Sequence, residues 1–156
     1  DPGNHLGCLA TPQHLATVHG FVERAAQQGA RCVLSGSRSN TPDNCFFPPT
    51  IFDCVTPAMQ IAREEVFGPV LSVLSYKDEA DAIRLANDCD FGLMANLWTS
   101  DGTRALRVAR QRKAGRIAIN GGGALRPNVP VFGYKLSGIG AELGFEEAIH
   151  EYTSSK

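Results

Sequence analysis

The chain has 156 residues, of which 43% are hydrophobic and 20% charged, a composition typical of one globular domain with a buried core. Its 15 Lys and Arg residues nearly balance 16 Asp and Glu residues, so the net charge of −1 argues against nucleic-acid binding and against a polybasic membrane contact. The sequence contains no apolar stretch of the roughly 18–20 residues that cross a membrane and no signal-peptide pattern at its start, so we expect a cytoplasmic protein.

The spacing of cysteine and histidine argues against metal and hydrolase chemistry. The five cysteines are scattered, with no CxxC pair and no His/Cys ligand spacing, so neither a zinc site nor a disulfide framework is expected. The four histidines form no HExxH motif and no Ser/His/Asp order. His14 and His19 also miss the i, i+4 spacing at which two helical histidines share a metal. We therefore assign the histidines no chemistry.

The first predicted element is a helix with clear ends. Thr11 can cap it, Pro12 suits its first turn, and Gly29 ends it. Apolar residues recur between these ends at helical spacing, namely Leu15, Val18, Val22 and Ala25. The pattern predicts a helix that covers a core with one face.

The next segments predict extended chain. Arg31–Leu34 is a short apolar run consistent with a strand, and Ser35–Asn44 has the composition of a surface loop. Phe46–Val55 contains Pro48 and Pro49, which cannot donate to a sheet ladder and exclude an uninterrupted central strand. We expect this segment to form an edge.

Strands and helices then alternate. Val70–Tyr76 is a β-branched run, and Asp78 can cap a helix that stops near Asn87. Leu93–Thr99 predicts another strand, followed by a helix that Ser100 or Asp101 can cap. That helix ends at Gly115, a strand follows at Arg116–Asn120, and after a Gly- and Pro-rich stretch at Gly121–Ser137 a last helix is expected over Ala141–Tyr152.

This alternation predicts the α/β class. Parallel strands can be joined only by a long return connection, usually a helix with a right-handed crossover. We therefore expect a parallel open sheet with helices on both faces.

Two glycine clusters could bind phosphates but lack the required context. Gly121, Gly122 and Gly123 follow a predicted strand, yet no helix N-terminus comes directly after them. The SGIGAELG run at 137–144 imitates a dinucleotide fingerprint, but loop-like sequence precedes it. Glycines in a tight turn into a helix are the simpler interpretation, and stand-alone dinucleotide binding by this run remains an alternative.

The run IAREEVFGPV at 61–70 resembles the Glu-(Ile/Val)-Phe-Gly-Pro motif of the NAD(P)-dependent aldehyde dehydrogenase family. Three further stretches occur in that family's order, and together they span most of the chain. They are AND with the following FGL near 86–93, ALRVARQRKAGRIAIN at 105–120, and GYKLSGIGAELG at 133–144.

The resemblance implies an oxidoreductase that converts an aldehyde to a carboxylic acid with NAD or NADP. It implies that Glu65 binds the hydroxyls of the nicotinamide-side ribose and that Phe67 packs beside the nicotinamide. In that family a cysteine thiolate attacks the aldehyde, hydride passes to the nicotinamide, and a Glu activates the water that hydrolyses the thioester. Adjacent Glu64 inherits no role.

By the resemblance, the two catalytic residues of the family would lie in segments upstream of Asp1, and no cysteine of this chain lies in a Gly-Gln-x-Cys context. The sequence starts at Asp1 in a loop-like stretch, so we expect a fragment that is inactive by itself. Its residues 1–144 would be a portion of the catalytic domain, and 145–156 would be a helix leading into the strand that pairs with a partner subunit in a homo-oligomer.

The substrate pocket differs from the family pattern. By resemblance its candidates are Gly121, Gly122, Gly123 and Val131. Where the family commonly has Pro-Phe-Gly-Gly, this chain has Pro130-Val131-Phe132-Gly133, so an aromatic is lost and a glycine that could take a positive φ is replaced. A noncatalytic relative acting as an assembly or regulatory module is the alternative to an enzyme.

Overall fold

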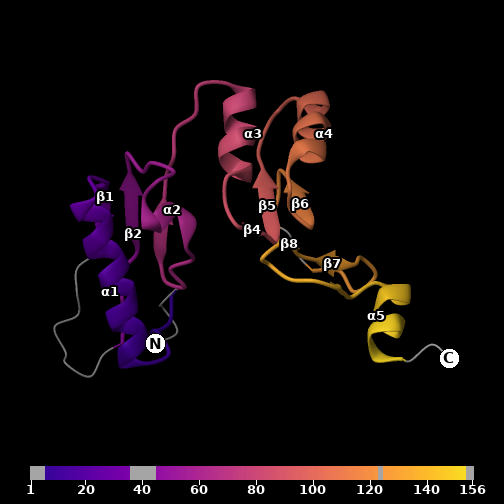
Figure 1. Cartoon of the computed structure of the whole chain (residues 1–156), viewed down its shortest axis with the longest axis horizontal. Coiled ribbons are helices and arrows are strands. Elements are labelled where there is room, and N and C mark those ends of the chain that lie inside the picture. Colours follow the sequence, from indigo (N-terminus) through magenta and orange to yellow (C-terminus); the bar gives the residue numbers. More distant parts are fainter. Residues whose placement is uncertain (1–5, 36–44, 123–124, 154–156) are drawn as a thin grey trace. The chain divides into compact units, whose positions relative to one another are not determined.

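The computed structural model describes residues 6–35, 45–122 and 125–153 (Figure 1). The chain divides into two compact units, Asp1–Ser75 and Tyr76–Lys156. The helices are α1 (Pro12–Gln27), α2 (Gln60–Arg63), α3 (Glu79–Asn87), α4 (Gly102–Gln111) and α5 (Phe145–Tyr152). The strands are β1 (Arg31–Ser35), β2 (Thr50–Asp53), β3 (Val70–Ser72), β4 (Phe91–Gly92), β5 (Met94–Leu97), β6 (Arg116–Ile119), β7 (Val131–Phe132), β8 (Tyr134–Lys135) and β9 (Ala141–Glu142).

Helix α1 has the predicted ends. The Thr11 side chain accepts a hydrogen bond from the backbone N–H of His14 at 3.1 Å, which satisfies one of the free donors of the first turn. Gly29 follows the helix with a φ of 97°, a left-handed conformation that suits glycine.

None of the helices in the described part of the chain has the length and apolarity needed to cross a membrane.

The sheet of the first unit corrects one prediction. β2 lies between β1, its antiparallel neighbour, and β3, its parallel neighbour, so it is the central strand and the expectation of an edge is wrong. The two prolines lie before Thr50, where the ladder begins, and therefore remove no hydrogen bond from it. A four-residue strand is short enough to be central directly after them.

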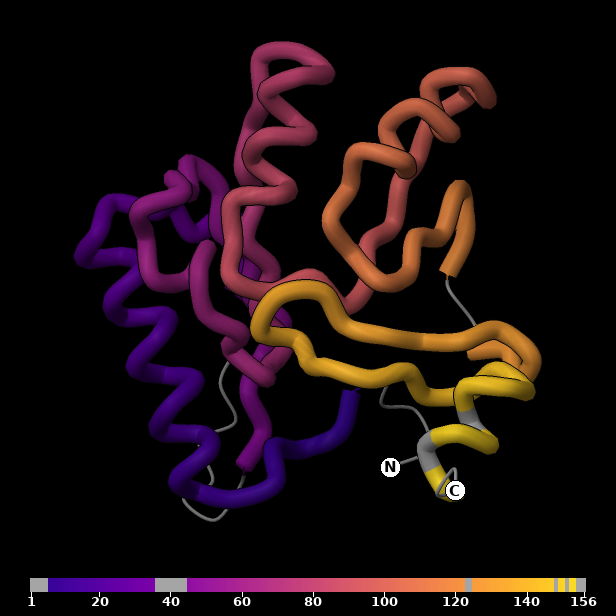
Figure 2. Tube along the Cα trace, turned by 45° about the vertical axis from the view of Figure 1, so that its right-hand side comes forward, coloured from indigo at the N-terminus to yellow at the C-terminus, as the bar shows by residue number. Residues whose placement is uncertain are grey.

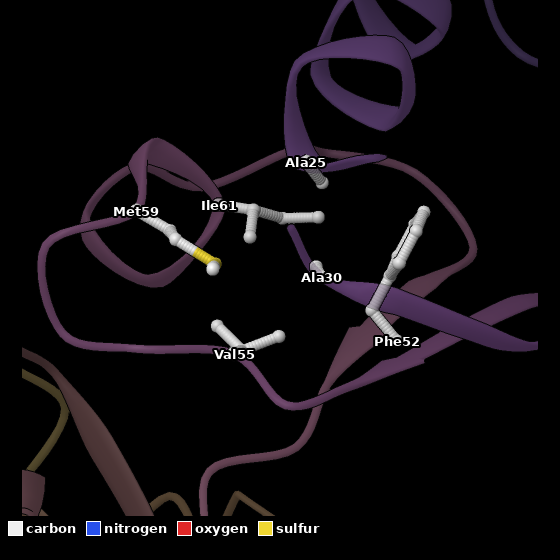
Figure 3. Packing of buried hydrophobic residues seen from close by; sticks show 6 residues of the cluster. All are labelled: Ala25, Ala30, Phe52, Val55, Met59 and Ile61. Carbon is white, nitrogen blue, oxygen red and sulfur yellow. The ribbon is translucent and has the colours of Figure 1, made fainter. Parts of the chain in front are cut away.

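One cluster of apolar side chains forms the core of the first unit. It joins α1, the sheet and α2, whose side chains point toward one another in Figure 3. Phe52 and Ile61 are buried there, and each such side chain contributes about 1.5–3 kcal/mol when it leaves water. The cluster consists of Ala25, Ala30, Phe52, Val55, Met59 and Ile61.

The second unit contains the predicted alternation of strands and helices. β5 and β6 pair in parallel, and α3 and α4 lie side by side (Figure 1). Asp78 caps α3, and Asp101 rather than Ser100 caps α4 by accepting from the Arg104 N–H at 3.0 Å.

The α/β class is confirmed. Among the described residues the strands form one three-stranded sheet and three two-stranded ladders. Of the strand pairs in this described part, only β2–β3 and β5–β6 are parallel.

The C-terminal segment differs from the expected loop and helix. β8 pairs with β4, and β7 pairs with β9, so that the two arms of this segment run side by side (Figure 2). The last helix begins at Phe145 rather than at Ala141, because Ala141 and Glu142 belong to β9 and Gly144 has a φ of 76°. Strand pairing with distant residues therefore overrides the local helical pattern.

Gly115 allows β7 to approach the strand that follows α4. A Cβ atom at this position would lie 1.5 Å from the carbonyl oxygen of Phe132, far inside contact distance. An alanine side chain fits at position 115 only if the backbone moves, since the clashing atom is a backbone oxygen and not the end of a flexible side chain.

We expect Gly115→Ala to lower the free energy of unfolding by about 2 kcal/mol or more. The matched control is Gly102→Ala at the start of α4, where an added Cβ meets no atom within 4 Å and alanine favours the helix. Urea unfolding curves of the two variants measure the difference. Equal midpoints for both would contradict the close approach.

An ion-pair network joins the start of α3 to α4. Arg107 donates two hydrogen bonds to the Glu79 carboxylate, at 2.8 and 2.7 Å, and Arg104 lies 3.2 Å from the same group. These contacts lower the pKa of Glu79, the hydrogen bonds from Arg107 being the main cause, although partial desolvation opposes them.

The lowered pKa predicts how stability depends on pH. The stabilisation by Glu79 is complete above the pKa of the residue in the unfolded chain and is lost as the pH falls through the lower pKa of the folded state. We expect Glu79→Gln to flatten this acid-side decrease in the unfolding midpoint. Acid titrations of both proteins, followed by circular dichroism, test this, and superimposable curves would speak against the network.

Candidate functional site

Glu65 and Phe67 lie on an exposed loop between α2 and β3. Both side chains face solvent among the described residues, and 71% of Phe67 is accessible. A ring this exposed is available to pack against the face of a ligand.

Phe67 has a strained backbone. Its φ of 51° lies in the left-handed region, which costs a residue other than glycine about 1–3 kcal/mol. A side chain from another element contacts this residue: His14 Nε2 in α1 lies 2.7 Å from the Phe67 carbonyl oxygen. The carbonyl can only accept, so the ring nitrogen donates.

Gly68 fixes the loop on the same helix. An added Cβ would lie 2.9 Å and 3.1 Å from the two γ-carbons of Val18, a fully buried side chain in the middle of α1. The chain next enters the sheet, where the N–H of Thr50 donates to the Pro69 carbonyl at 2.9 Å. The loop is thus tied to α1 on one side and to β2 on the other.

The two adjacent glutamates have different surroundings. The Glu64 carboxylate accepts a hydrogen bond from the Gln60 side chain at 2.9 Å. Within the described residues no hydrogen bond or ion pair engages the Glu65 carboxylate, which leaves its oxygens available to hydroxyl donors of a ligand. The structure therefore distinguishes Glu65, for which the family resemblance implies a role, from Glu64, for which it implies none.

The glycine candidates of the pocket follow β6 in the second unit. Asn120, with a φ of 53°, bridges the ends of β5 and β6: its side chain accepts from the Thr99 N–H at 2.9 Å and donates to the Thr99 carbonyl at 2.8 Å. Gly121 is half-buried, and a Cβ at Gly122 would meet open space. Gly123 lies outside the described residues.

Val131 is half-buried in β7 and pairs with Glu142 of β9. Its neighbour Phe132 is not among the residues with positive φ, so the replacement of the family's glycine causes no left-handed strain here. The Phe132 ring lies 5.8 Å from the Tyr134 ring, a spacing typical of aromatic pairs.

The SGIGAELG run does not form a phosphate-binding turn. Gly138 and Gly140 lie in the connection from β8 to β9, both with positive φ, and α5 begins only after β9. A dinucleotide fingerprint needs a strand that turns directly into a helix. Over residues 6–35, 45–122 and 125–153 no group of three or more His, Cys, Asp or Glu side chains is placed to hold a metal ion.

The sequence did not reveal the contacts that hold these loops. His14 lies 53 residues before Phe67, and Asn120 lies 21 residues after Thr99, so no local pattern signals either pairing. The only available sign was the type of residue, since asparagine tolerates a positive φ better than most residues. Phenylalanine offers no such sign.

Comparison with known proteins gives a consistent set of relatives. The profile of the aldehyde dehydrogenase family matches residues 1–156. Betaine aldehyde dehydrogenase of Cereibacter sphaeroides is 44% identical over 156 residues, which are 100% of this chain and 32% of that protein. The chain therefore spans about a third of the length of the curated relatives it matches.

Solved structures are similar over the same extent. A structure of betaine aldehyde dehydrogenase from Staphylococcus aureus in complex with NAD⁺ has a TM-score of 0.93 and 35% identity, covering 100% of this chain and 31% of that one. The NAD-dependent aldehyde dehydrogenase from Sinorhizobium meliloti has a TM-score of 0.91 and 40% identity, with 99% and 31% covered.

Gly68→Ala tests how the loop is held. The new methyl group must displace either the loop or the rigid, buried Val18, so we expect a loss of about 1–3 kcal/mol in unfolding free energy. Chemical denaturation measures this loss. Gly7→Ala, where a Cβ meets no atom within 4 Å, is the control and should unfold like the parent chain. An alanine variant at 68 that is as stable as this control would show that the contact is not tight.

Proposed function

The chain belongs to the aldehyde dehydrogenase family, and on this premise we propose that it serves an oxidoreductase that converts an aldehyde to a carboxylic acid with NAD or NADP. The observation that carries this proposal is the loop 65–69. It presents a carboxylate and an aromatic ring to solvent while its backbone is fixed to α1.

The residues present fit the nicotinamide half of such a cofactor. When bound, the cofactor would supply the hydride acceptor. Glu65 would accept hydrogen bonds from two vicinal ribose hydroxyls, because an ionised carboxylate has only acceptors and no competing partner within the described residues. The Phe67 ring, 71% accessible, would form a wall that limits where the nicotinamide ring swings.

Other assignments belong to the same proposal. Gly121, Gly122, Gly123 and Val131 would border the aldehyde pocket, where a lack of bulky side chains leaves room for substrate. The names of the relatives make betaine aldehyde the first substrate to test. Residues 1–144 would act as a catalytic-domain portion and 145–156 as the approach to a subunit-pairing strand in a homo-oligomer.

We further propose that the nucleophilic cysteine and the general base act from sequence outside this chain. None of its cysteines lies in the Gly-Gln-x-Cys context of the family nucleophile. The chain alone should therefore not reduce NAD⁺ or NADP⁺ in the presence of aldehydes. Aldehyde-dependent reduction by the purified 156-residue chain would refute this part of the proposal.

Paired glutamine variants test the cofactor role in the complete encoded polypeptide. Glu65→Gln keeps the size of the side chain but removes the charge that accepts both hydroxyl protons, so we expect KM for the dinucleotide to rise roughly tenfold, corresponding to about 1.4 kcal/mol. Glu64→Gln is the matched control and should leave KM unchanged, since its carboxylate contacts Gln60. Equal effects of both variants on KM would contradict the assignment.

The gene sequence that precedes the codon for Asp1 decides between enzyme and noncatalytic module. A Gly-Gln-x-Cys stretch with a dinucleotide-binding βαβ unit would support the enzyme. If the encoded polypeptide has neither, the assembly or regulatory module becomes the better hypothesis. The SGIGAELG alternative predicts that NADH quenches the fluorescence of the single Trp98 in the isolated chain, which we do not expect.

A further inference from the structure

We propose that His14 is a positioning residue for the loop 65–69, the proposed nicotinamide loop: it holds Phe67 in its left-handed conformation by donating from Nε2 to the Phe67 carbonyl. This inference rests on the proposed role of the loop. It gives a structural role to a histidine that belongs to no recognised motif. The contact joins the first turn of α1 to a loop 53 residues away, at 2.7 Å.

The ring of Phe67 is mostly exposed and has little packing to orient it. It is 71% accessible, and the aromatic contacts of the described residues do not include it. The backbone conformation of Phe67 therefore sets the direction of its Cα–Cβ bond, from which the ring projects. Because a φ of 51° is unfavourable for phenylalanine, that backbone needs an external restraint.

The restraint acts on the position of the Phe67 carbonyl oxygen. A change of φ at Phe67 would swing this carbonyl about the N–Cα bond, away from His14, and break the hydrogen bond. The following residue cannot compensate, because Gly68 packs against Val18 and its own carbonyl accepts from the Val70 N–H at 2.7 Å. Leaving the left-handed conformation at Phe67 would therefore cost contacts both at its carbonyl and at Gly68.

His14 is itself held in place. Its backbone N–H donates to the Thr11 side chain at 3.1 Å, and its Cα lies in the capped first turn of α1. The donor thus stands on a rigid element. Any side chain that carries an N–H at the position of Nε2 should make the same hydrogen bond. A side chain that is one atom shorter should not.

Glutamine and asparagine provide this matched pair. The glutamine amide nitrogen reaches as far along the side chain as histidine Nε2, whereas the asparagine nitrogen ends at the position of Nδ1. In nuclear magnetic resonance spectra of the full chain, a positive φ gives a strong NOE between the amide and α protons of the same residue. We expect this NOE at Phe67 in the parent chain and in His14→Gln, and its loss in His14→Asn.

A second measurement needs no variant. Long-range ¹H–¹⁵N correlation spectra of the His14 ring should show a proton on Nε2, as donation to a carbonyl requires. A bare Nε2 with the proton on Nδ1 would overturn the inference. So would a Phe67 NOE that persists in His14→Asn while the methyl resonances of buried Val18 report an intact fold.

The functional consequence is tested separately from the proposed function. In the complete polypeptide His14→Asn should raise KM for the dinucleotide roughly three- to tenfold, and His14→Gln should restore it. If the Phe67 NOE responds as expected but neither His14→Asn nor Glu65→Gln changes KM, the anchor stands and the cofactor role of the loop is wrong. If Glu65→Gln changes KM while His14→Asn does not, the positioning role is wrong.

Discussion

The contact between Gly68 and Val18 is the constraint on which the site of the first unit depends. Val18 is fully buried on α1, and the absence of a side chain at 68 lets the loop backbone rest directly on it. This contact places the Phe67 carbonyl beside His14 and directs the chain into β3. The side chains of Glu65 and Phe67 are left to solvent, while the glycine and proline of the loop make the structural contacts.

The features that sequence predicted correctly are those decided within a few residues. Thr11 and Asp78 cap helices because a short side-chain oxygen reaches the N–H groups of the next turn, and this chemistry needs no partner from elsewhere. The glutamate, phenylalanine and glycine of the loop were found for another reason, as part of a family motif. The exposure of Glu65 and Phe67 is consistent with the roles that the motif implies, but the motif alone gave no conformation.

The features that sequence could not predict depend on partners far along the chain. β2 is central because β1 and β3 pair with both its edges, a fact that the prolines before Thr50 obscured. Ala141 belongs to a strand because β7 lies beside it, despite a helical local pattern. The positive φ of Phe67 is the clearest case, since phenylalanine has no preference for it and the donor that holds it lies on another helix.

Two residues of the second unit, like Phe67, have a positive φ together with a side-chain hydrogen bond to the backbone of another segment. Asn120, at the end of β6, has a φ of 53° and is fixed by hydrogen bonds between its own amide and the Thr99 backbone. Lys135, in β8, has a φ of 58°, and its Nζ donates to the carbonyls of Asn87 and Cys89 at 2.7 and 2.6 Å. In each case a left-handed backbone conformation coincides with a side-chain hydrogen bond that joins two segments. Such strain persists only where the surroundings over-determine it, which explains why these contacts join separate elements.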